Sequence, residues 1–105
     1  MTSYNKTFTQ LAAAGNGETF AVGDSKDHTF VITVAAVDTS VDFNFQYSLD
    51  GTTWIDFISS DVQKTANGSF EYAYVGKPVN MVRPVFAVEV GGTAVTLDVV
   101  YKGQK

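Results

Sequence analysis

The chain has 105 residues and carries 11 acidic and 7 basic side chains, which gives a formal net charge of −4. This length suits one domain with a single core, and the absence of cysteine excludes disulfides and thiolate metal sites. No two basic residues are adjacent, and no apolar run approaches the roughly 20 residues needed to cross a bilayer. We therefore expect no nucleic-acid partner and no membrane segment.

The predicted elements, in chain order, are short strands rich in Val, Thr, Phe and Tyr, separated by turns of Gly, Asn and Asp. Such spacing predicts an all-β fold, an antiparallel β-sandwich of about eight strands with a jelly-roll or an immunoglobulin-like strand order. We expect residues 1–105 to form one domain, with 1–11 as a candidate partner-binding N-terminal strand or arm. Strands are expected over residues 4–11, 18–22, 28–37, 41–49, 53–58, 69–75, 79–90 and 94–102.

Residues 41–58 predict a hairpin, because apolar and polar residues alternate strictly over 41–49 and an Asp-Gly turn follows. A three-residue loop at 50–52, capped by its Asp, places Tyr47 opposite Ile55 and leaves Trp54 on the outward side. Two interpretations remain open for the segment SLDGTTW. It is either a plain hairpin turn whose Trp covers a sheet edge, or a site where Trp54 stacks on a sugar or anchors a protein interface.

A second hairpin is predicted at the Gly-Gly turn of residues 91 and 92. A two-residue turn there places Val90 opposite Thr93, and the pairs that follow on the same face, such as Phe86 with Leu97, are all apolar. The other face of this hairpin is mixed. Because a one-residue slip would exchange the two faces, we expect the register to be well specified.

Catalytic chemistry has little support in the residue pattern. His28 is the only histidine, and it follows a turn beside Ser25 and Asp27, where nothing aims a base at a nucleophile. We expect His28 to be exposed or to lie at an interface. The acidic residues are scattered over turns and lack the spacing of a calcium loop. We therefore expect no enzyme and no catalytic, cofactor-binding or metal-binding residue.

Apolar side chains occupy many positions that face outward in these predicted strands. In so small a protein they favour a partner surface or a homo-oligomer, a dimer or a trimer. The candidate interface or ligand contacts are Tyr4, Phe8, Leu11, Trp54, Met81, Val85 and Val100.

The segments FQYSLDGTTWIDF and NMVRPVFAVEVGGTAVTLDVVYKG, with the Thr-Ala-Asn-Gly of residues 65–68 between them, resemble a small family of tailed-bacteriophage virion proteins. The start of the chain, NKTFTQLAAAGNGETFAVG, shares this resemblance, which thus covers essentially the whole chain. It implies a capsid decoration or cement protein that binds the major capsid protein and other virion proteins. The implied location is the capsid surface of the virion, after assembly in the bacterial host cytoplasm. A tail or neck component is the neighbouring possibility.

A weaker resemblance links the Tyr-Ser-x-Asp-Gly-x-x-Trp pattern at 47–54 to discoidin-type galactose-binding-like jelly rolls. This chain is shorter than those modules, and Arg83 matches their Arg-containing strand only loosely. The resemblance implies an alternative function, a carbohydrate-binding module on the virion surface, with a glycan as the partner of Trp54.

Overall fold

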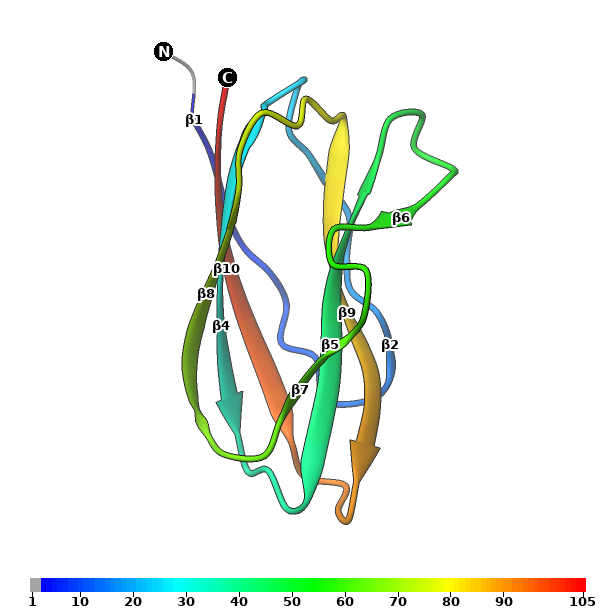
Figure 1. Ribbon diagram of the computed structural model, residues 1–105, viewed down its shortest axis with the longest axis vertical. Helices are drawn as coiled ribbons and strands as arrows, with labels where there is room; N and C mark the ends of the chain where they lie inside the picture. The colour runs from blue at the N-terminus through cyan, green and yellow to red at the C-terminus, as the bar shows by residue number, and fades with distance from the viewer. Residues whose placement is uncertain (1–2) are drawn as a thin grey trace.

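The computed structural model describes residues 3–105, which form ten strands in two antiparallel sheets packed face to face (Figure 1). This confirms the predicted all-β sandwich. Within the described residues there is no helix long and apolar enough to span a membrane. The sandwich is elongated, with principal extents of 42 × 25 × 22 Å.

The strands are divided between a four-stranded sheet and a sheet that contains six strand segments. The first sheet has the order β1-β10-β4-β8, formed by β1 (Ser3–Thr7), β10 (Thr96–Gln104), β4 (Asp27–Ala35) and β8 (Gly68–Tyr74). The second has the order β2-β9-β5-β6, formed by β2 (Gly15–Asn16), β9 (Met81–Val90), β5 (Ser40–Ser48) and β6 (Ile55–Asp56). Two further short strands join this sheet, β3 (Phe20–Ala21) on β9 and β7 (Val62–Lys64) on β5.

The connectivity distinguishes between the two strand orders that the sequence allowed. From β4 through β5, β8 and β9 to β10, each long strand lies in the opposite sheet from the one before it. This alternation is that of a jelly roll. Two edge positions are each occupied by a broken strand, β2 with β3 on β9 and β6 with β7 on β5. Ten segments therefore fill eight strand positions, as the sequence predicted.

The predicted hairpin at Gly91 and Gly92 is wrong. Strand β9 belongs to the second sheet and β10 to the first, so the chain crosses the sandwich between them (Figure 1). Phe86 pairs with Phe43 of β5, and Leu97 pairs with Val34 of β4. The apolar faces were identified correctly from Val82 to Phe86 on β9 and from Val95 to Tyr101 on β10, but they meet across the core and not side by side. Val88 and Val90, predicted for the same face, are 44% and 48% exposed, because the strand register shifts between Asp42 and Phe43. Alternation alone does not tell these two arrangements apart.

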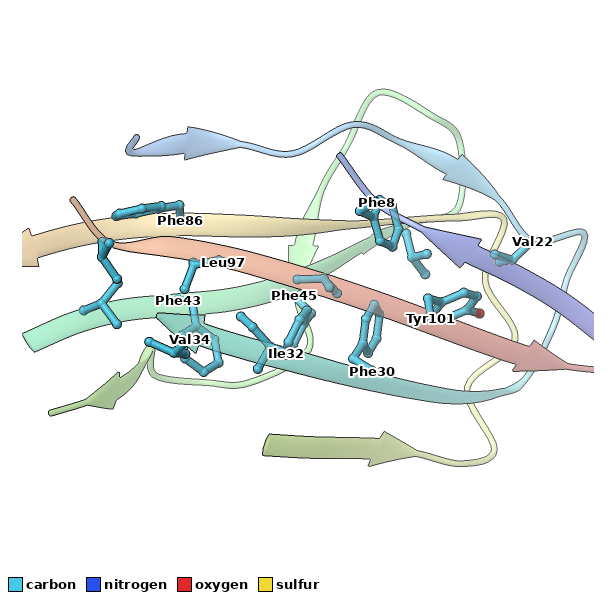
Figure 2. Packing of buried hydrophobic residues seen from close by; sticks show 14 of the residues in the cluster. Phe8, Val22, Phe30, Ile32, Val34, Phe43, Phe45, Phe86, Leu97 and Tyr101 are labelled. Carbon is cyan, nitrogen blue, oxygen red and sulfur yellow. The ribbon is translucent and has the colours of Figure 1, made fainter. Parts of the chain in front are cut away.

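The core fills the space between the sheets with aromatic and β-branched side chains (Figure 2). Phe30 of β4 and Phe45 of β5 stack with ring centroids 4.3 Å apart. The ring centroid of Tyr101 on β10 lies 4.9 Å from that of Phe30. All three are completely buried. Contacts between rings from opposite sheets supply both apolar burial and aromatic interaction energy, and they fix how the sheets face each other.

Candidate functional site

The seven candidate contacts separate into a buried group and two groups on opposite faces of the sandwich. Phe8 is only 3% exposed and belongs to the core, while Tyr4 and Leu11 are partly buried against it. Strand β1 pairs along its whole length with β10, and Phe8 donates its backbone N–H to Val99 at 2.9 Å. Residues 3–7 are therefore an edge strand of the first sheet, and Phe8 is used for folding and not for surface contact. Residues 1 and 2 of the predicted N-terminal arm lie outside the described residues.

The outer face of the first sheet carries Val100, which is 50% exposed. In register beside it stand Val31 of β4 and Thr7 of β1. Together with Thr29 and other neighbours they line an open depression of about 330 Å³. We call Thr7, Thr29, Val31 and Val100 the valine face. Its centre is apolar, and hydroxyl groups surround that centre. The lining of the depression also includes Asn5, Lys6 and Lys102, and the face adjoins β1, one of the two edge strands of the sheet.

The outer face of the second sheet carries Trp54, Met81 and Val85, all partly exposed. Trp54 packs against Arg83 of β9, with the guanidinium carbon 4.1 Å from the centre of the indole ring. Trp54 therefore lies over the face of the sheet and does not simply cover an edge. The sequence placed Trp54 outward but did not predict Arg83 as its neighbour.

A chain of hydrogen bonds continues from Arg83 across the sheet. Arg83 donates its Nε–H to Oε1 of Gln46 on β5 at 2.9 Å, and Gln46 donates from Nε2 to Oδ1 of Asp56 on β6 at 2.9 Å. Both pairs stand directly opposite each other in the strand register. We call Trp54, Arg83, Gln46 and Asp56 the Trp54 row. Burial lowers the pKa of Arg83, although the guanidinium remains charged at any ordinary pH.

The turn before Trp54 is held by local hydrogen bonds, as the sequence predicted. Asp50 accepts the backbone N–H groups of Thr52 and Thr53 at 2.9 and 2.7 Å, and Ser48 Oγ accepts that of Gly51 at 2.7 Å. These bonds favour the ionised carboxylate and lower the pKa of Asp50. Tyr47 pairs with Ile55, which confirms the predicted register of the hairpin. The turn thereby fixes the direction in which Trp54 leaves the strand.

His28 is buried, and the expectation of an exposed or interfacial histidine is wrong. It is 1% exposed, with Nδ1 2.6 Å from the Tyr101 hydroxyl and Nε2 2.8 Å from the Lys77 carbonyl oxygen. A carbonyl can only accept, so Nε2 carries the proton and Nδ1 accepts the hydroxyl proton of Tyr101. Burial lowers the pKa of His28 and keeps the ring neutral. Through these two hydrogen bonds, His28 connects β10 to the loop that follows β8.

Within residues 3–105, no group of three or more His, Cys, Asp or Glu side chains lies close enough together to hold a metal ion. The acidic residues that the sequence scatters along its turns also remain scattered in space. Asp50 and Asp56, the two acids near Trp54, accept hydrogen bonds from the turn and from Gln46. Two surfaces that carry sequence-predicted contacts are open to a ligand or partner, the valine face and the Trp54 row.

The fold and the strand order place the protein in the class of antiparallel β-sandwiches with jelly-roll connectivity. No protein-family model matches the chain, and no curated protein matches it. Among solved structures, the chain is similar to the SPBc2 prophage-derived protein YomS, with 14% sequence identity and a TM-score of 0.64. That similarity covers 97% of this chain and 92% of the other.

A second solved structure, of a CBM4 carbohydrate-binding module, is similar at 13% sequence identity and a TM-score of 0.56. The similarity covers 85% of this chain and 61% of that one. At such identities, the two similarities show a shared fold alone. They agree with the β-sandwich that the sequence predicted and with its two sheets.

Proposed function

We propose that this protein is a non-enzymatic structural protein of a phage virion, and specifically a capsid decoration or cement protein. Two observations support a phage origin. The ordered turn motifs of the sequence resemble a phage virion family, and the fold is similar along nearly its whole length to a protein described as prophage-derived. A tail or neck position would use the same kind of surface.

The single observation that carries the proposal is the valine face. Val100 is exposed on the outer face of a four-stranded sheet, with Thr7 on one neighbouring strand and Val31 on the other, at a position where folding alone would accept a polar side chain. An open, shallow depression with an apolar centre suits the surface of another protein better than it suits a small molecule, which needs a deeper enclosure.

The proposed mechanism is passive. Burial of Val31, Val100 and the outer edge of β1 against neighbouring subunits of the major capsid protein would hold those subunits together. A protein bound at many equivalent lattice positions commonly associates with itself, so a dimer or trimer is part of the proposal. Assembly takes place in the bacterial host cytoplasm, and the mature location is the capsid surface.

Cosedimentation with phage heads that lack the protein tests this proposal. The bound copies per head are counted for the unmodified protein, for Val100→Lys and for Val90→Lys. Val90 is a matched control, because it is 48% exposed but belongs to the second sheet. We expect saturable binding in a number that matches the symmetry of the lattice, lost in Val100→Lys and retained in Val90→Lys. Absence of binding by the unmodified protein would overturn the proposal.

A further inference from the structure

The Trp54 row is organised beyond what folding of the second sheet requires. Its members come from β6, β5 and β9, which lie side by side (Figure 1), and from the turn before β6. Neighbouring strands are separated by about 4.8 Å, so the three polar side chains span roughly 10 Å across the sheet. Asp56 is exposed at the outer surface, and Gln46 and Arg83 are partly exposed.

Gln46 occupies the centre of the row and uses both ends of its amide. Its oxygen accepts from Arg83 Nε and its nitrogen donates to Asp56 Oδ1, so Gln46 holds a cation on one side and an anion on the other. The terminal nitrogens of Arg83 and Oδ2 of Asp56 form no hydrogen bond with residues 3–105. A set of donors and an acceptor therefore face solvent at a fixed separation.

Trp54 adds a rigid aromatic surface beside these polar groups. Its ring is held by Arg83 at 4.1 Å and by a turn that Asp50 and Ser48 close with four hydrogen bonds to backbone N–H groups. Side chains that are already fixed lose little conformational freedom when a ligand binds. An aromatic surface flanked by oriented donors and acceptors is complementary to a molecule with apolar C–H faces and many hydroxyl groups.

We propose that the Trp54 row is a binding site for a neutral carbohydrate. The C–H face of a sugar ring packs on Trp54, and the terminal N–H groups of Arg83 donate to sugar oxygens. Asp56 accepts a hydrogen bond from a hydroxyl group through its open oxygen. Gln46 acts as a positioning residue, because its amide oxygen and its amide nitrogen are each bonded to a neighbour in the row and thereby orient Arg83 and Asp56.

Charge selects a neutral sugar over an anion. Arg83 by itself would attract a carboxylate or a phosphate, but Asp56 stands at the other end of the same row and repels it. The net charge of −4 acts in the same direction. Hydroxyl groups both donate and accept, so they satisfy the cation and the anion together. The open polar groups next to Trp54 are charged, and an apolar side chain of a protein partner would leave them without hydrogen bonds.

The site is tested with an array of neutral and acidic oligosaccharides, followed by calorimetric titration of the neutral sugars that bind. We expect binding to neutral sugars, with a shift in Trp54 fluorescence. Each of Trp54→Ala, Arg83→Lys and Asp56→Asn should weaken affinity roughly tenfold or more, since each loses a stacking surface or a charge-assisted hydrogen bond. Glu71→Gln, an exposed acid on the first sheet, is the matched control and should bind normally.

Gln46 requires its own readout, because a purely structural residue would act through stability. Gln46→Ala should weaken sugar binding with an unchanged unfolding midpoint, and Gln46→Glu, which retains the acceptor for Arg83 Nε, should recover part of the affinity. The proposal is overturned if the protein binds no neutral sugar or if the row variants bind as well as Glu71→Gln. It is equally overturned if these variants lose capsid binding, which would make the row a protein contact.

Discussion

Removal of one buried hydroxyl group tests the hydrogen-bond network around His28. In Tyr101→Phe the ring stays in the core, but the group that donates to His28 Nδ1 at 2.6 Å is lost. Both residues are almost completely buried, so Nδ1 becomes an acceptor without a partner and without water. A buried unsatisfied group of this kind costs about 1–3 kcal/mol of unfolding free energy. Urea denaturation of the two proteins at pH 7.5 measures this difference.

Tyr74→Phe is the matched control for this experiment. The Tyr74 hydroxyl forms no hydrogen bond with residues 3–105, and its ring would keep its stacking on Phe57 at 4.7 Å. Burial raises the pKa of Tyr74 to about 12, so that its hydroxyl is neutral throughout the measurement. We expect a change below about 0.5 kcal/mol, as for other substitutions that break no specific interaction. Equal losses of unfolding free energy in Tyr101→Phe and Tyr74→Phe would refute a stabilising hydrogen bond between Tyr101 and His28.

The same network predicts how stability depends on pH. The folded protein lowers the pKa of His28 below 6.5, so the unfolded chain binds its proton first as pH falls. Stability is therefore fully present above pH 6.5 and decreases below it, by at most about 1.4 kcal/mol per pH unit. Urea denaturation between about pH 7.5 and pH 5, above the usual carboxylate range, measures this slope. A slope that persists in His28→Gln would assign it to other groups.

Two further predictions concern packing and backbone. Phe45→Ala should cost about 3–5 kcal/mol in chemical denaturation, because its ring is fully buried, whereas Leu49→Ala, at 63% exposure, should change stability by less than about 0.5 kcal/mol. Gly91→Ala should lower the thermal midpoint more than Gly76→Ala. Both glycines have positive φ, +91° for Gly91 and +69° for Gly76, but only at Gly91 would an added Cβ collide with Thr39. Similar thermal midpoints for the two variants would contradict this predicted collision.

The features that could be predicted from the sequence are those that depend on residues close together in the chain. The hairpin around Asp50 was predicted with its register, because turn chemistry and alternation act within a few residues of each other. The position of Trp54 followed from the same reasoning. Gln46 and Asp56 could also have been predicted as a pair, since the register that places Tyr47 opposite Ile55 places them opposite each other.

The errors arose where distant segments meet. Arg83 reaches Trp54 only because β9 pairs with β5, and no local pattern specifies that pairing. The Gly91 hairpin failed because an apolar face looks the same whether its partner lies beside it or across the core. His28 is different, because a signal was present. It shares the period-two positions of Phe30 and Ile32, which are buried, and that alternation indicates an inward histidine.

The position of β10 has a consequence for folding during synthesis. Residues 96–104, the last strand in chain order, lie between β1 and β4, and the three segments come together only in the first sheet (Figure 1). A nascent chain cannot complete this sheet until residues 96–104 have left the ribosome, and Phe30 and Phe45 remain without the Tyr101 side of their core until then. The loops to be closed are long, so folding should be slow and all-or-none. Nascent chains that end before β10 should therefore be held by chaperones or degraded, and a folded copy of this domain shows that translation has passed residue 104.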